Sequence, residues 1–331
     1  MKRYRTCLLS FAVVAFLGCG SEASDGTPAE SSAEPAGATL PALPPGAQAM
    51  SLLGEPLFPP ETPADVRAGQ QAQLDEALAD LEADPEGADA LIWAGRRYAY
   101  MGDYRKAVEI FGRGIELHPG DARFYRHRGH RHITLREFDD AITDLDRAAE
   151  LIQGTADMVE PDGQPNALGI PTSTLHFNIW YHLGLAHYLK GEFQEAADKY
   201  SQCMDASAHP DSKVATAHWW YMSLRRDGRE GEARALVHGL DLDALAPDVI
   251  ESGSYLDLLR LYASEGEGEG APDPGSLEGA TRGYGIGNWK LYNGDTEGAL
   301  EVFRTIVGAR NQWGAFGYIA AEADLARMES R

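Results

Sequence analysis

The chain of 331 residues carries 51 acidic against 29 basic side chains, which gives a formal net charge of −22. A protein that binds nucleic-acid phosphates needs clustered Lys and Arg, so this charge argues against nucleic-acid binding and against broad adhesion to anionic lipid. The length allows one or two domains, and three cysteines are too few for a disulfide framework.

The amino-terminal residues are typical of an export signal. Three basic side chains lie within the first five residues, and the apolar run at residues 7–17 follows them. This run is too short to span a hydrocarbon layer of about 30 Å. We therefore expect residues 1–18 to be a signal peptide.

The end of that run resembles the lipobox of bacterial lipoproteins, although Phe16 stands where a leucine is usual. The resemblance implies a lipoprotein signal peptide and a lipid on Cys19, which would tether the protein to a membrane of the bacterial cell envelope. Gly20, in place of an aspartate, favours the outer membrane. The alternative is cleavage without lipidation, which would leave the protein periplasmic or secreted.

Residues 19–64 are predicted to form a disordered tether. Residues 20–64 hold nine of the eighteen prolines among Ala, Ser, Gly and Glu. Such a composition buries too little apolar surface to offset the entropy of the chain. Whether the apolar side chains near its end attach to the first helix stays open; they are Leu52, Leu53, Leu57 and Phe58.

An internal period of 34 residues follows the tether. It is marked by the pairs Pro85 and Pro119, Gly95 and Gly129, and Ala107 and Ala141. Apolar residues between these marks recur at spacings of three and four, which indicates helices. Gly102 suits the end of one helix and Asp103 the N-cap of the next. The period therefore predicts pairs of antiparallel helices.

These pairs resemble tetratricopeptide repeats. The first match spans residues 88–119, a second begins at Ala122 and a third at Phe177, with weaker copies from Val214 and Ala280. The resemblance implies an all-α solenoid over residues 65–331. We expect repeats at about 88–121, 122–155, 177–210, 214–247 and 280–310, loops at about 154–173 and 264–275, and a capping helix at about 313–328 with a polar outer face.

In tetratricopeptide arrays the first helix of each pair lines the concave groove, which implies a set of partner-binding residues. They are Trp93, Arg96, Arg123, Arg126, His127, His130, Tyr181, His182, His218 and Trp219. Between Arg96 and Glu137 there are ten basic and five acidic residues, so the charge of the chain is segregated. Arginine forks and aromatic rings suit an anionic ligand with apolar parts.

We therefore expect the groove to bind an acidic or carboxylate-ended peptide of a partner protein. The alternative is that Arg123, Arg126, Arg128 and Arg131 pair with acids of neighbouring helices and only hold the stack together. Chaperone-binding repeats carry a carboxylate clamp of Lys and Asn. The corresponding places here hold Ile92, Arg96, His127, Asn178 and His182, which do not reproduce it.

The histidines do not predict a metal site. On a helix His127 and His130 share a face, but His132 is turned about 200° from His130, so the three cannot converge on one ion. A contact between His127 and His182 would require close stacking of two repeats. Protonation of these imidazoles between about pH 5 and 7 is a second possibility, and it would strengthen anion binding.

Enzymatic function is not indicated. The sequence has none of the nucleophile, zinc-protease or phosphate-loop motifs, and the glycines at 283, 285 and 287 fall within a predicted helix. The sequence therefore predicts a non-enzymatic, membrane-tethered scaffold for protein–protein interaction, without a cofactor. A receptor for a small anionic ligand in the envelope is the alternative.

Overall fold

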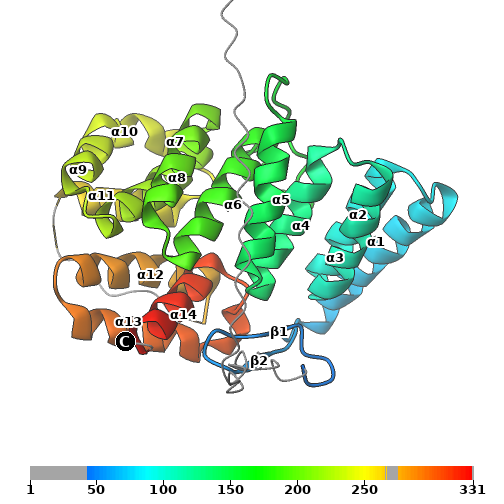
Figure 1. Cartoon of the computed structure of the whole chain (residues 1–331), viewed down its shortest axis with the longest axis horizontal. Helices are drawn as coiled ribbons and strands as arrows, with labels where there is room; N and C mark the ends of the chain where they lie inside the picture. The colour runs from blue at the N-terminus through cyan, green and yellow to red at the C-terminus, as the bar shows by residue number, and fades with distance from the viewer. Residues whose placement is uncertain (1–42, 265, 267–274, 330–331) are drawn as a thin grey trace, which may run out of the picture. The chain divides into compact units, whose positions relative to one another are not determined.

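The computed structural model describes residues 43–264, 266 and 275–329 (Figure 1). The proposed signal peptide, Cys19 and residues 20–42 of the tether lie outside the described residues, as does most of the acidic loop at 264–275. The described residues belong to one compact unit. Within them, no helix is both long and apolar enough to cross a membrane.

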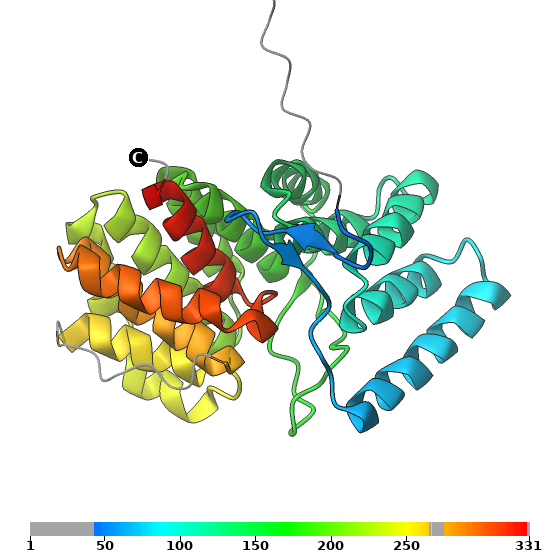
Figure 2. The same ribbon diagram turned by 90° about the horizontal axis from the view of Figure 1, so that it is seen from below.

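The fold is an all-α solenoid of antiparallel helix pairs, and it confirms the predicted fold class (Figures 1 and 2). Successive helices pack against one another along the chain. The helices are α1 (Ala64–Ala83), α2 (Ala88–Tyr100), α3 (Tyr104–Leu117), α4 (Ala122–Leu135), α5 (Phe138–Leu151), α6 (Leu175–Lys190), α7 (Phe193–Ala206), α8 (Pro210–Arg226), α9 (Glu230–Gly239), α10 (Leu242–Leu245), α11 (Gly253–Ser264), α12 (Leu277–Tyr292), α13 (Thr296–Gly308) and α14 (Phe316–Glu329), with short 3-10 turns at Ala246–Asp248 and Arg310–Gln312.

A recurring contact between the two helices of a pair explains the period of the sequence. A glycine on the first helix lies under a large side chain sixteen residues later on the second helix, and a Cβ at the glycine would overlap that side chain. The pairs are Gly95 and Phe111, Gly129 and Leu145, Gly184 and Tyr200, and Gly287 and Phe303. In the α8–α9 pair, Ala217 and Ala233 take these places, and both are fully buried. Small residues thus let the paired helices approach closely.

The turns inside the pairs use left-handed residues. Gly102 has φ 83°, and the side chain of Asp103 caps α3 by accepting from the Lys106 backbone N–H at 3.2 Å. Gly191 takes the same conformation with φ 86°. In the turn between α4 and α5 the left-handed residue is Arg136, with φ 68°, and no other described non-glycine residue has a positive φ.

The prediction of a disordered tether that extends to residue 64 is wrong for residues 43–63, which are part of the folded structure. Strands β1 (Ala49–Met50) and β2 (Pro56–Leu57) form an antiparallel hairpin (Figure 2). Ala49 and Leu57 are buried in the main core. The hairpin contacts the C-terminal end of the chain, because Leu52 N–H donates to Glu322 Oε1 at 2.6 Å and Trp313 Nε1 donates to the Phe58 carbonyl at 2.6 Å. Burial of Ala49 and Leu57 thus outweighs the Pro-rich composition.

The last helix, α14, is not a cap with a polar outer face. It packs against α6, α12 and α13, and its residues 317–325 are buried. Two of these are acidic. Glu322 pairs with Arg136, and Asp324 pairs with Arg226 at 2.8 Å. The polar residues of α14 are therefore satisfied by buried ion pairs instead of by solvent.

Candidate functional site

The loop between α5 and α6 folds back over the helices that precede it. We call the surface formed by α2, α4 and α6 the inner face. Among residues 153–170, only Glu160 and Gly163 are buried. The sequence places this loop on one face of the stack, and the structure shows that it lies on the inner face (Figure 2).

Glu160 is held by side chains from two helices. Its carboxylate lies 3.0 Å from Arg126 Nε and 3.6 Å from His127 Nε2, both on α4. Asn178 Nδ2 on α6 donates to Glu160 Oε2 at 3.1 Å. All four side chains are buried, so the carboxylate interacts at a lower dielectric than at the surface.

Two arginines of α2 hold the backbone after Glu160. Arg96 Nη1 donates to the Pro161 carbonyl at 2.8 Å, and Arg97 Nη1 donates to the Gly163 carbonyl at 3.0 Å. Gly163 packs against the hydroxyl of Tyr100, where a Cβ would collide. The segment after Glu160 is therefore bound through its backbone, and it requires a residue without a side chain at position 163.

A cavity of about 220 Å³ lies beside this segment. Arg96, Arg126 and Arg131 line it, together with His127, His130 and Tyr100. The acids in its wall are Glu160, which is buried, and Asp162 and Glu251, which are exposed. Arg131 stacks over the Tyr104 ring at 5.5 Å and has no carboxylate partner among the described residues. The cavity thus holds more buried positive than buried negative charge.

Burial is the largest cause of the lowered pKa values of these groups. Burial lowers the pKa of Arg131 to about 10. Burial, followed by the charges of Arg126 and Arg96, lowers the pKa of His127 well below its usual value, and His130 and His182 are lowered in the same direction mainly by burial. These imidazoles therefore stay neutral near pH 6, which argues against the pH-dependent anion binding considered from the sequence.

The predicted groove residues fall into two groups. Eight of them lie on or beside the inner face. Trp93, Arg123, Arg96 and His127 line a second cavity of about 210 Å³, and His130 and Tyr181 line a third of about 620 Å³ with Tyr255 and Phe316. His182 is buried, with its ring centroid 4.2 Å from that of His130 and not against His127.

His218 and Trp219 do not line the groove. His218 stacks on Tyr255 and Tyr262, and Trp219 packs edge-on against Tyr188; both are almost fully buried. The extra helix α11 covers this part of α8, which removes the inner surface that a regular array would expose there.

The alternative prediction is that four arginines pair with acids of neighbouring helices. Only two of the four, Arg123 and Arg128, do so. Arg123 bonds Asp121 and Asp89, both at 2.6 Å, and Arg128 forms a double hydrogen bond with Asp144 at 2.7 Å. These two hold the stack together. Arg126 pairs with the loop instead, and Arg131 faces the cavity.

The clamp positions take on a related role with different side chains. Arg96, His127 and Asn178 stand at places where chaperone-binding repeats carry their clamp. Here Arg96 contacts Pro161, and His127 and Asn178 contact Glu160. Sequence reasoning missed Glu160, Pro161, Asn178 and Arg131 as parts of one site. No spacing in the sequence indicates that the loop returns to the inner face.

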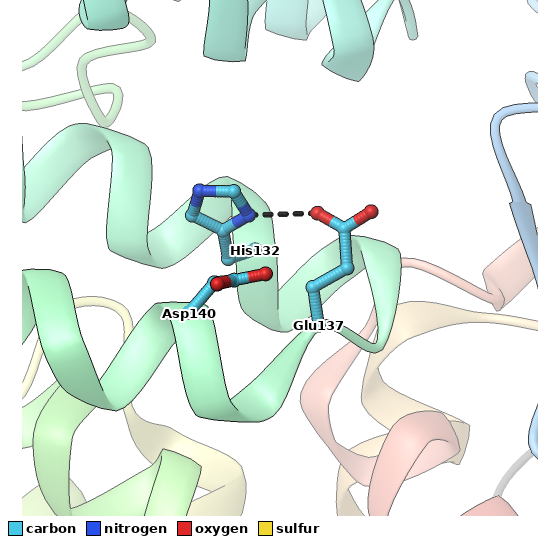
Figure 3. A group of neighbouring side chains, drawn as sticks. All are labelled: His132, Glu137 and Asp140. Atoms are coloured by element: carbon cyan, nitrogen blue, oxygen red, sulfur yellow. Dashed lines mark hydrogen bonds and ion pairs between the residues drawn. The ribbon is translucent and has the colours of Figure 1, made fainter.

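His132, Glu137 and Asp140 form a group whose ligand atoms lie within 4.8 Å of one another (Figure 3). His132 Nδ1 is hydrogen-bonded to Glu137 Oε2 at 2.7 Å. The next repeat carries the same arrangement, because His187 Nδ1 contacts Glu192 Oε2 at 2.7 Å. A bond that recurs between the end of one helix and the start of the next is a turn-stabilising contact, so we assign no ion to this group.

Known proteins are similar to part of the chain. Residues 94–157 match the tetratricopeptide repeat family model. The small glutamine-rich tetratricopeptide repeat-containing protein 2 of Saccharomyces cerevisiae is 23% identical over 205 residues, which cover 62% of this chain and 49% of the yeast protein. The chain thus spans about half the length of this relative.

Two solved structures align over a larger share of their own length. YrrB, described as a TPR protein with an unusual peptide-binding site, is 14% identical with a TM-score of 0.39 and covers 70% of this chain and 91% of its own. MamA is 19% identical with a TM-score of 0.40 and covers 52% and 86%. Residues 94–157, which match the family model, form helices that pair as tetratricopeptide repeats do, so this part of the chain is similar to tetratricopeptide repeat proteins.

Proposed function

We propose that the protein is a non-enzymatic, membrane-tethered scaffold that binds an acidic side chain or a terminal carboxylate of a partner protein on its inner face. One observation carries the proposal: three arginines, Arg96, Arg126 and Arg131, line the 220 Å³ cavity, and Glu160 is the one buried acid among the described residues of its wall. Tetratricopeptide repeat proteins typically mediate protein–protein interactions, which supports a protein as the ligand.

The chemistry of the cavity favours a carboxylate. Charge-assisted hydrogen bonds from guanidinium groups are about twice as strong as neutral ones, and they discriminate by geometry. The whole chain has a net charge of −22, so the cationic cavity is an exception to its overall acidic charge. An anionic partner is therefore attracted to the inner face and repelled elsewhere, which favours one binding orientation.

The membrane tether rests on the amino-terminal sequence. The apolar run and Cys19 resemble a lipoprotein signal, and several acyl chains on one cysteine anchor a protein permanently, at about 0.8 kcal/mol for each buried methylene. We place the protein in the bacterial cell envelope, with the outer membrane preferred because Gly20 follows the cysteine. Acylation of Cys19 is tested by mass spectrometry of the mature protein, and an unmodified cysteine there removes the tether.

A small anionic ligand is the second candidate, and one observation favours it. The loop covers the inner face, and the cavity of about 220 Å³ is smaller than the pockets of about 300–1,000 Å³ that hold drug-sized ligands. A free carboxylate or a small anion fits this volume without opening the loop.

The decisive experiment compares Arg131→Gln with Arg147→Gln. Arg131 has no carboxylate partner in the described part of the chain, so its loss leaves no buried acid there unpaired. Arg147, in contrast, pairs with Glu150 on the exposed side of α5. Partner capture from solubilised envelope by cross-linking and mass spectrometry is expected to fall about tenfold for Arg131→Gln alone. Equal capture by both folded variants would exclude the inner face. A thermal-shift panel of small carboxylates on the same variants tests the second candidate.

A further inference from the structure

Residues 158–163 lie on the inner face in the way that an extended peptide ligand lies in a groove. One acidic side chain, Glu160, enters between α4 and α6, and the two following contacts are made by backbone carbonyls of Pro161 and Gly163. A backbone bridge between Val159 and Thr174 keeps the segment extended at its start. Side chains of three successive repeats therefore bind one stretch of the same chain.

This segment divides one groove into two compartments. The cavities of about 220 and 210 Å³ lie on either side of it, and both are lined by Arg96, His127, Glu160 and Pro161. Because Glu160 and Pro161 form the shared wall, withdrawing the loop would join the two spaces. The joined groove would then extend from Trp93 to His130.

The loop is held by few contacts other than those of residues 160–163. Its large apolar side chains stay in solvent, with Val159, Leu168 and Ile170 exposed by 54%, 67% and 43%. Its second attachment is to the exposed Glu251, which accepts from Asn166 and Thr172 at 2.9 Å. A segment that buries little apolar surface and is held by polar contacts opens at low cost.

The fit of Glu160 to its site is also incomplete. Arg126 Nε lies 3.0 Å from the carboxylate, but this buried N–H has no hydrogen-bond acceptor among the described residues. Arg131, on the other side of the cavity, has no carboxylate partner there either. A ligand with a better-placed carboxylate would satisfy donors that Glu160 leaves unused.

We propose that residues 158–163 are an intramolecular ligand of the inner face, and that the partner binds by displacing them with a segment of the same chemistry. This inference rests on the proposed function and specifies its partner. The displacing segment is extended, carries a carboxylate in the place of Glu160, and has a glycine three residues later, where Tyr100 leaves no room for a side chain. The loop keeps the cationic groove covered until such a segment arrives.

The first test supplies the loop as a separate peptide. A variant of the full chain carries a flexible Gly/Ser linker of equal length in place of residues 157–170, and a fluorescent peptide of residues 156–166 is titrated against it. The peptide is expected to bind this variant about tenfold or more tightly than the unaltered chain, because the tethered loop no longer competes at high effective concentration. Equal binding to both chains overturns the inference.

Matched peptides test which atoms are recognised. Glu160→Gln and Gly163→Val in the peptide are each expected to weaken binding about tenfold, because one loses the carboxylate and the other collides with Tyr100. Gln164→Ala is the control, since Gln164 is exposed and lines neither cavity, and it should bind as the natural peptide does. A Glu160→Gln peptide that binds as well as the control would overturn the assignment of the carboxylate.

A second readout works if the linker variant does not fold. Thermolysin cleaves before large apolar residues, and Leu168 and Ile170 are exposed sites for it in the loop. Glu160→Gln in the full chain is expected to raise the rate of cleavage there about tenfold, with Gln164→Ala unchanged. Equal rates for Glu160→Gln and the natural chain contradict the inference.

The outcomes separate this inference from the proposed function. If partner capture depends on Arg131 but the loop peptide shows no preference for the linker variant, the intramolecular ligand is wrong and the proposed function stands. The opposite result is that the peptide prefers the linker variant but Arg131→Gln captures as much partner as Arg147→Gln. The proposed function then fails, and so does the inference that a partner segment displaces residues 158–163.

Discussion

Arg136 and Glu322 form a buried ion pair across 186 residues of sequence, with Arg136 Nη2 at 2.7 Å from Glu322 Oε2 and Arg136 Nε at 3.2 Å from Oε1. The guanidinium also donates to the carbonyls of Thr134 and Trp313. Arg136 occupies a left-handed turn position where other repeats have glycine. The ion pair of the Arg136 side chain, which joins the α4–α5 turn to α14, thus compensates for the strained backbone of Arg136.

Arg136→Gly tests this exchange of strain for an ion pair. Glycine relieves the backbone, which is worth about 1 kcal/mol, but it leaves Glu322 buried without its cation, which costs about 3–5 kcal/mol. We expect the free energy of unfolding in urea to fall by about 2–4 kcal/mol. Arg136→Gly combined with Glu322→Leu should recover much of the loss. A single variant as stable as the natural chain would show that the pair contributes nothing.

Gly95→Ala tests the close approach of paired helices. Alanine favours helix formation by about 1 kcal/mol over glycine, yet its Cβ would overlap the Phe111 ring, and overpacking costs about 1–3 kcal/mol. We expect thermal unfolding to shift to lower temperature. Gly112→Ala on α3 is the control, because its Cβ would meet only Arg128 Nη1 at an ordinary 3.5 Å. Stabilisation by both variants would contradict the packing explanation.

Leu57→Ala tests whether the hairpin belongs to the fold. Leu57 is 4% exposed, whereas Leu52 of the same hairpin is 37% exposed. Truncating a buried leucine costs about 2–5 kcal/mol, so Leu57→Ala should destabilise the protein by about that amount. Leu52→Ala should cost less than about 1 kcal/mol. Equal small effects of the two variants in urea melts would support the disordered tether that composition predicts.

The buried imidazoles predict a pH-dependent stability. Burial lowers the pKa of His218 to about 3, below its usual value near 6.5. The unfolded chain therefore binds a proton that the folded chain does not between these values. Stability is fully present above about pH 6.5 and is lost as the pH falls toward 3, by about 1.4 kcal/mol per pH unit for each such histidine.

His218→Phe isolates one of these groups. The variant should show a shallower fall of unfolding free energy between pH 6 and 4, by about 1.4 kcal/mol per pH unit, in urea melts at fixed ionic strength. His127, His130 and His182 are lowered in the same direction and should continue to destabilise the acidified protein. An unchanged slope would mean that His218 is protonated in the folded state.

The helical repeats could be predicted because their causes are local. Gly95 and Phe111, or Gly129 and Leu145, lie sixteen residues apart in the same helix pair, so the contact that joins them repeats in the sequence. The groove residues on α2 and α4 follow from the same register. His218 could not be placed, because Tyr255 and Tyr262, which stack on it, belong to α11, a helix outside the regular repeats.

The sequence by itself determined the helix pairs, their period and the cationic side chains of α2 and α4, because these depend on residues within a single helix pair. Tertiary structure alone decided that Glu160 enters the cationic site, that the hairpin at residues 49–57 joins the core and that α14 turns inward. Each of these depends on contacts between distant segments, such as Arg136 with Glu322, whose stability comes from burial and complementary charge. Neither burial nor complementary charge between distant segments leaves a periodic signal along the chain.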